Sequence, residues 1–103
     1  MTASSDSIRF LQEGASQAAA MLRTVGNEHR LLILCLLIEH QEMTVGALNS
    51  YVDLSQSALS QHLAKMREEN LITYRRDAQT LYYRIADPKI EQLISTLKTI
   101  FCP

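Results

Sequence analysis

The sequence predicts a mainly α-helical fold that carries one two-stranded β-hairpin, and two observations support this class. Apolar residues recur at intervals of three and four over most of the chain, which is the period of an amphipathic helix. Only between residues 71 and 86 do apolar and polar residues alternate, which is the period of a strand. With 103 residues, 47% of them hydrophobic, residues 1–103 are expected to form a single domain with a modest core.

The N-terminal half predicts two helices. Residues 1–7 are polar and show no period, so we expect them to be disordered. Residues 8–26 carry one apolar stripe rich in alanine, which predicts a first helix with a close helix contact. Asn27 is a predicted N-cap for a second helix that runs to about residue 40. This helix is apolar on nearly every side over residues 31–38, so we expect the rest of the domain to surround it.

The next two helices are short and close together. Thr44 is predicted to cap a helix over residues 45–51, and Ser55 to cap a longer one that extends to about residue 70. A tight turn at residues 53–54 joins them. Two helices joined by so short a turn predict a helix-turn-helix.

The helix over residues 56–70 has two contrasting faces. Leu59, Leu63 and Met66 lie within roughly 60° of one another, which predicts a buried face. The opposite face carries short polar side chains around a small alanine, namely Ser57, Ser60, Gln61, Ala64 and Lys65. Serine and glutamine can exchange hydrogen bonds with base edges in the major groove, and alanine can touch a thymine methyl group. We therefore predict a DNA recognition helix, the alternative being plain helix surface.

The C-terminal part predicts a hairpin and a last helix. Residues 71–76 and 80–86 are the predicted strands, and the charged tip over residues 75–79 should project into solvent or onto a phosphate backbone. Asp87 and Pro88 mark the start of a helix whose wide apolar stripe continues to its last turn. Because so wide a face needs a partner in a small domain, we expect a homodimer through the first and last helices. The predicted order is α-α-α-α-β-β-α, a winged helix-turn-helix.

Basic residues are concentrated where DNA contact is expected. The net charge is −1, but residues 55–84 hold five basic residues against three acidic ones, whereas residues 1–54 hold three against six. Such a local excess favours nucleic acid, although it is also compatible with an ordinary solvated surface. The predicted DNA-contacting residues are Gln56, Ser57, Ser60, Gln61, His62, Lys65, Arg67, Arg75, Arg76 and Gln79.

These residues are expected to play different roles. Ser57, Ser60 and Gln61 are predicted to contact base edges, and Gln56 either a base or a phosphate. Lys65 and Arg67 are expected to contact phosphates. In the hairpin, Arg75, Arg76 and Gln79 are expected to contact phosphates or to enter the minor groove. The alternative for the hairpin is charge that is simply solvated. For His62 we expect a structural role or a phosphate contact.

Several other classes of protein are disfavoured. The longest apolar run, residues 31–38, is far below the roughly 20 residues of a membrane span and does not lie where a signal peptide would, so we expect a soluble cytoplasmic protein. The chain shows no nucleophile elbow, phosphate loop or carboxylate pair, so we expect neither an enzyme nor a cofactor. A winged helix that binds only protein would carry a hydrophobic or acidic outer face over residues 55–70, which this sequence lacks.

Three segments and the hairpin together resemble the ArsR family of winged-helix repressors. The segments are residues 27–31 (NEHRL), 44–48 (TVGAL) and 54–63 (LSQSALSQHL), and the resemblance covers residues 8–102. Metal-sensing members of that family carry a cysteine pair in the third helix, or Asp and His ligands in the last. Here residues 44–52 contain no cysteine and residues 88–101 no histidine, so those metal sites are absent.

Cys35 in the second helix and Cys102 near the C-terminus resemble the thiols of a sulfur- and redox-responsive branch of the family. The resemblance implies a sensing dithiol that reactive sulfur species or an oxidant would bridge, with release of operator DNA. Taken singly, Cys35 fits an inert core residue and Cys102 an exposed thiol. A metal-responsive repressor with an unusual site and a DNA-binding anti-repressor are the alternatives, and the sequence names neither operator nor inducer.

Overall fold

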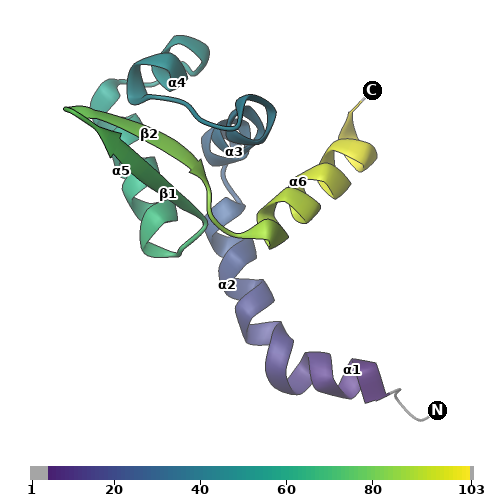
Figure 1. The fold of residues 1–103 in the computed structure, drawn as a ribbon. Coiled ribbons are helices and arrows are strands. Elements are labelled where there is room, and N and C mark those ends of the chain that lie inside the picture. The colour runs from purple at the N-terminus through teal and green to yellow at the C-terminus, as the bar shows by residue number, and fades with distance from the viewer. Residues whose placement is uncertain (1–4, 103) are drawn as a thin grey trace.

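The computed structural model describes residues 5–102, and its elements are arranged as in Figure 1. In chain order they are α1 (Ser5–Arg9), the π-helical segment η1 (Phe10–Gly14), α2 (Ala15–Val25), α3 (Glu28–His40), α4 (Val45–Tyr51), α5 (Gln56–Glu68), β1 (Ile72–Asp77), β2 (Thr80–Ile85) and α6 (Pro88–Phe101). This confirms the predicted helix-turn-helix with a two-stranded hairpin. The helix predicted over residues 8–26 is the one element whose helix type differs from the prediction, because a π-helical segment interrupts it.

That first helix is a helical arm built from α1, η1 and α2, and it extends away from the rest of the domain (Figure 1). The arm begins earlier than predicted: Ser5–Ser7 lie in α1, so the expectation of disorder was wrong for them. Asp6 in the first turn complements the positive end of the helix dipole, and each residue added to an existing helix gains a backbone hydrogen bond. The same expectation for residues 1–4 lies outside the described residues.

The core surrounds α3, as predicted from its apolar sequence. Ile33, Leu34 and Leu37 are at most 1% exposed, whereas Leu32 on the outer side is 42% exposed. The predicted buried face of α5 is confirmed, because Leu59, Leu63 and Met66 are also at most 1% exposed. The hairpin and α6 close the core with Ile72, Tyr83, Ile90 and Ile94.

All four predicted helix caps are present. Each cap side chain accepts a hydrogen bond from a backbone N–H in the first turn of its helix, which satisfies a donor that has no partner within the helix. The caps are Asn27 for α3, Thr44 for α4, Ser55 for α5 and Asp87 for α6. The sequence therefore specifies where these helices begin.

The hairpin is antiparallel and pairs residues 72–77 with residues 80–85. Its turn is shorter than the tip predicted over residues 75–79, because Arg75 and Arg76 belong to β1 and only Ala78 and Gln79 connect the strands. Ala78 adopts a φ of 56°, which an alanine rarely occupies. Met43 and Tyr83 exchange two backbone hydrogen bonds, of 3.0 and 2.8 Å, and so attach β2 to the segment before α4.

Leu59→Ala should lower the free energy of unfolding by about 2–5 kcal/mol, because it removes buried methyl groups and leaves a cavity in the core. The neighbouring exposed Ser60→Ala is the matched control and should change it by less than about 0.5 kcal/mol. Denaturant titrations at one protein concentration measure both values. Equal effects of the two substitutions would contradict the assignment of faces on α5.

Candidate nucleic-acid interface and thiol pair

The outer face of α5 is open to solvent. Ser57, Ser60, Gln61 and Lys65 are exposed, and the opposite side of the same helix is buried in the core. The turn that leads into α5 is held by the Asn49 side chain, whose Nδ2 donates to the Leu54 carbonyl at 2.8 Å. α5 therefore presents short hydrogen-bonding side chains on a helix that is fixed from behind.

His62 lies at the edge of this face and makes a contact within the protein. Its Nδ1 accepts a hydrogen bond from Arg30 Nε at 3.0 Å, and its ring centroid lies 6.0 Å from that of His29. Burial lowers the pKa of His62 below its ordinary value. Electrostatic repulsion from Arg30, and to a smaller extent from His29, lowers the pKa further. Of the two roles expected for His62, the structural one accounts for this geometry.

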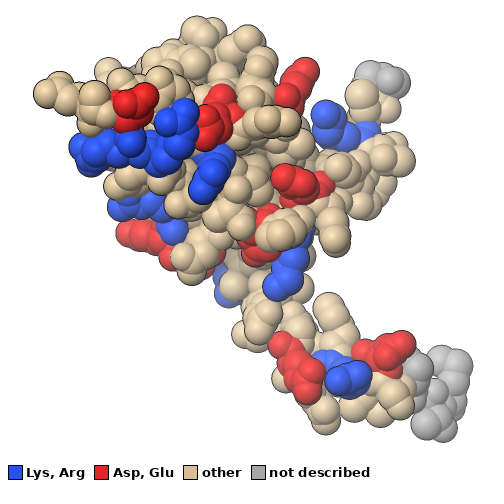
Figure 2. Space-filling model, viewed as in Figure 1, with Lys and Arg blue, Asp and Glu red and all other residues tan. Residues whose placement is uncertain are grey.

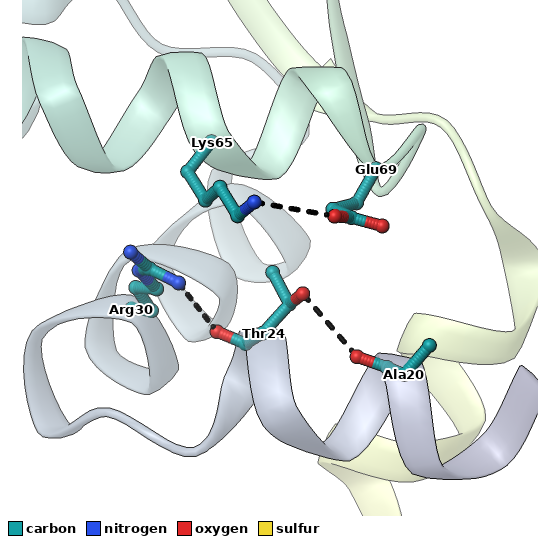
Figure 3. A network of polar contacts seen from close by, with 5 residues as sticks. All are labelled: Ala20, Thr24, Arg30, Lys65 and Glu69. Carbon is teal, nitrogen blue, oxygen red and sulfur yellow. Dashed lines mark hydrogen bonds and ion pairs between the residues drawn. The ribbon is translucent and has the colours of Figure 1, made fainter.

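The two basic residues of α5 are tethered only weakly. Lys65 Nζ lies 3.4 Å from Glu69 Oε1, as Figure 3 shows, and both side chains are about half exposed, so this pair adds little to stability. The Arg67 guanidinium lies 4.9 Å from the centre of the Tyr74 ring, which is a cation–π distance. A phosphate oxygen could therefore replace these contacts without loss of a strong bond.

Arg75, by contrast, is already engaged. Its Nε and Nη2 donate to the two carboxylate oxygens of Glu42 at 2.8 and 3.0 Å, and the guanidinium lies 4.3 Å from the centre of the Tyr82 ring. The hydrogen bond from Arg75 lowers the pKa of Glu42, and the same hydrogen bond raises the pKa of Arg75. A contact between Arg75 and DNA would have to compete with this bidentate pair.

Further along the hairpin, Arg76 and Gln79 are exposed, and Arg76 has no ion-pair partner among residues 5–102. Gln56 is likewise exposed at the start of α5. Lys and Arg side chains gather over the hairpin side of the molecule in Figure 2, with a few acidic side chains among them. The structure thus brings the predicted DNA-contacting residues of α5 and the hairpin to neighbouring parts of one domain, since α5 packs against β1.

Sequence reasoning missed Arg30 and Glu42, the partners of His62 and Arg75. Each pair is more than 30 residues apart in the chain, and no local period connects them. The only hint was that Arg30 belongs to the NEHRL segment on which the family resemblance rests.

The two cysteines are free thiols in different environments. Cys35 is half-buried on α3, and Cys102 is exposed at the C-cap of α6, where its N–H donates to the Lys98 carbonyl at 2.8 Å. α6 packs against α3, and Cys35 lies against the same hydrophobic core to which Ile90 and Ile94 of α6 belong. The last turn of α6 carries two large apolar side chains that do not join the core, because Ile100 and Phe101 are 63% and 76% exposed.

Residues 5–102 hold neither a cluster of metal ligands nor a membrane-spanning helix. This part of the chain contains no group of three His, Cys, Asp or Glu side chains that could hold a metal ion. None of the helices in this range has the length and apolarity needed to cross a membrane.

The lowered pKa of His62 predicts a pH-dependent stability. As pH falls below the ordinary His pKa of 6.5, His62 is protonated more readily in the unfolded chain than in the folded one. The free energy of unfolding is therefore highest above this pH and falls below it. His62→Asn keeps an acceptor but removes the titration. Between about pH 7.5 and about pH 5.5, the free energy of unfolding should therefore fall more for the unsubstituted protein than for this variant. Parallel curves for the two proteins would contradict the assignment.

Comparison with known proteins gives the chain its family. The family described as "Bacterial regulatory protein, arsR family" matches residues 27–74. The HTH-type transcriptional regulator YgaV of Escherichia coli is 46% identical over 93 residues, covering 90% of this chain and 94% of that protein. The transcriptional activator HlyU of Vibrio cholerae is 38% identical over 95 residues, covering 92% and 87%.

Solved structures agree with this match. The transcriptional repressor BigR of Xylella fastidiosa superposes with a TM-score of 0.86 at 33% identity, covering 100% of this chain and 99% of that one. The reduced form of HlyU from Vibrio cholerae gives a TM-score of 0.84 at 38% identity, covering 92% and 99%. These relatives are named as transcriptional regulators, and the resemblance to the ArsR family is confirmed. The chain therefore belongs to the ArsR family of DNA-binding transcriptional regulators.

Proposed function

We propose that this protein is a homodimeric repressor that reads operator DNA with α5 and the hairpin, and that a Cys35/Cys102 dithiol controls its release. The observation that carries the proposal is the outer face of α5, where Ser57, Ser60 and Gln61 are exposed on a helix whose other side is fixed in the core. A helix of this kind fits the major groove of B-DNA.

The DNA contacts divide by chemistry. Ser57, Ser60 and Gln61 exchange hydrogen bonds with base edges, and the small Ala64 allows the helix backbone to approach closely. Phosphates are met by the exposed charges of Lys65, Arg67 and Arg76, with Gln56 and Gln79 at the two margins. Arg75 joins them only if it leaves Glu42, so its first role is to hold the hairpin.

The homodimer forms through the arm and α6. Large apolar side chains are exposed on both, and exposed surface of this kind in a small domain favours association. They are Ile8, Phe10, Leu11 and Leu22 on the arm and Ile100 and Phe101 on α6. An open groove between α2 and the body, lined in part by Met21 and Leu71, adds further surface for a second copy. A dimer places two recognition helices about 34 Å apart on one face of DNA.

The switch is a thiol exchange between α3 and α6. With a persulfide RSSH, one cysteine thiolate takes the outer sulfur and releases RSH; the second thiolate then attacks the protein-bound sulfur of the new persulfide and expels hydrogen sulfide, leaving a disulfide. With a peroxide, a sulfenic acid forms first and the second thiol displaces water. A direct bond requires the two Cα atoms to come within about 7 Å, so the switch requires the C-terminal end of α6 to reach Cys35 on α3.

A bridge between the thiols would draw the last turn of α6 against α3 and change how the dimer faces meet. Because both recognition helices must fit the same face of DNA, a small rotation at the interface is enough to lose the operator. The relatives include a repressor and an activator by name, and an anti-repressor that displaces another DNA-binding protein is the second candidate. A repressor and an anti-repressor would both bind DNA through the outer face of α5.

Substitution of the base-contacting residues should lower specific binding. Ser60→Ala and Gln61→Ala should each weaken binding to a duplex selected from random sequences by about 1–3 kcal/mol, with little change for a scrambled duplex. The exposed Ser95→Ala on α6 is the matched control and should leave both affinities unchanged. Equal losses on the selected and scrambled duplexes would argue against base recognition by α5.

Bridging of the thiols should weaken DNA binding by about 5- to 150-fold, the range of typical coupling free energies. Reduced protein is treated with glutathione persulfide or with hydrogen peroxide, and each product is identified by intact mass and tested for DNA affinity and oligomeric state. Cys35→Ser and Cys102→Ser should each bind DNA and lose the response. A bridged dimer with unchanged affinity for the selected duplex would overturn the switch.

A further inference from the structure

Arg30 joins three elements that are distant in the sequence. It lies in the first turn of α3, where its own N–H is held by the Asn27 cap at 3.2 Å. Its Nη1 donates to the carbonyl of Thr24 in α2 at 3.0 Å, a bond drawn in Figure 3. Its Nε donates to His62 Nδ1 of α5, also at 3.0 Å. A single planar side chain thus connects the end of the arm to the recognition helix.

The contact with Thr24 closes the C-terminal end of the arm. Carbonyls in the last turn of a helix have no partner within that helix, and a positive charge there complements the negative end of the dipole. Thr24 is only 4% exposed, and its hydroxyl donates back to the Ala20 carbonyl at 3.3 Å. The guanidinium therefore meets a part of the arm that is itself held in place.

The contact with His62 adds a directional restraint to α5, whose opposite side is packed in the core. Arginine has no acceptor, so the hydrogen bond requires Nδ1 to be unprotonated. The lowered pKa of this ring is consistent with that state. His62 lies between Gln61, which faces outward, and Leu63, which is buried. Anchoring the ring therefore sets the angle at which the outer face of α5 is presented.

We propose that Arg30 is a positioning residue for DNA recognition: through Thr24 and His62 it sets the orientation of α5 relative to the arm without touching DNA. The inference depends on α5 being the recognition helix, as proposed above. In a dimer joined through the arm, this orientation fixes where each α5 lies relative to the two-fold axis. Its loss would misalign the two recognition helices on the same DNA.

The experiment compares four substitutions on the selected duplex. Arg30→Gln and His62→Ala should each lower affinity about tenfold, and the double variant should lose no more than Arg30→Gln alone, because each single substitution already breaks the hydrogen bond between these two residues. His62→Asn places an amide oxygen near the position of Nδ1 and should stay within about twofold of the unsubstituted protein. Arg30→Lys should behave like Arg30→Gln, because an ammonium group lacks the planar fork that reaches both acceptors.

Salt dependence separates positioning from phosphate contact. For Arg30→Gln, the slope of log affinity against log salt should match that of the unsubstituted protein, and binding to a scrambled duplex should be retained. Arg76→Gln is the comparison variant and should lower the slope by about one and weaken binding to all duplexes alike. Dimer mass and thermal unfolding of each variant are measured alongside.

Three results would overturn the inference. A slope for Arg30→Gln that falls as it does for Arg76→Gln would make Arg30 a phosphate contact. Additive losses in the double variant, or a loss in His62→Asn equal to that in His62→Ala, would show that the hydrogen bond itself does not matter. If Arg30→Gln does not fold, the difference in DNA affinity between His62→Ala and His62→Asn decides whether the hydrogen bond matters. Absence of DNA binding by the unsubstituted protein would instead refute the proposed function.

Discussion

The burial of α3 is the packing interaction on which the other elements depend. Ile33 and Leu34 are fully buried, and α6 and β2 pack directly against this helix. Burying an aliphatic side chain of this size contributes about 1.5–3 kcal/mol, so a helix apolar on nearly all sides is stable only when its neighbours cover it. Both α5 and α6 join the core that forms around α3, and each leaves its outer face exposed.

Polar contacts then fix the angles that apolar packing leaves open. Hydrophobic burial is not directional, whereas a hydrogen bond loses strength when its geometry changes. The hairpin is held by the backbone pair of Met43 and Tyr83 and by the bidentate pair of Glu42 and Arg75. On the other side of the domain, Arg30 holds α5 against α2. Both elements that are proposed to contact DNA are therefore held in part by residues outside them.

The two ends of the described chain contrast with this well-packed centre. No residue of α1 or η1 is buried, and the last turn of α6 exposes Ile100 and Phe101. Cys102 follows that turn directly and is exposed, whereas Cys35 is half-buried on α3, the helix that the core surrounds. In the proposed switch, a bond between the two thiols would change DNA affinity only if it moved the C-terminal end of α6 relative to α3.

The sequence by itself determined the elements and their buried faces. Helix starts at Asn27, Thr44, Ser55 and Asp87 follow from cap chemistry that acts within one turn, and the buried face of α5 follows from its period. These are local properties, which is why they could be predicted from neighbouring residues alone. The family resemblance rests on the same segments.

Only the tertiary structure decided which side chains meet. The partner of His62 is 32 residues away and that of Arg75 is 33 residues away, so no pattern in the chain assigns them. The π-helical segment at Phe10–Gly14 and the inclusion of Arg75 and Arg76 in β1 were likewise not predicted, because they depend on small backbone adjustments that composition and period do not specify. Long-range polar pairs form where packing happens to bring two elements together, and this packing is a property of the whole fold.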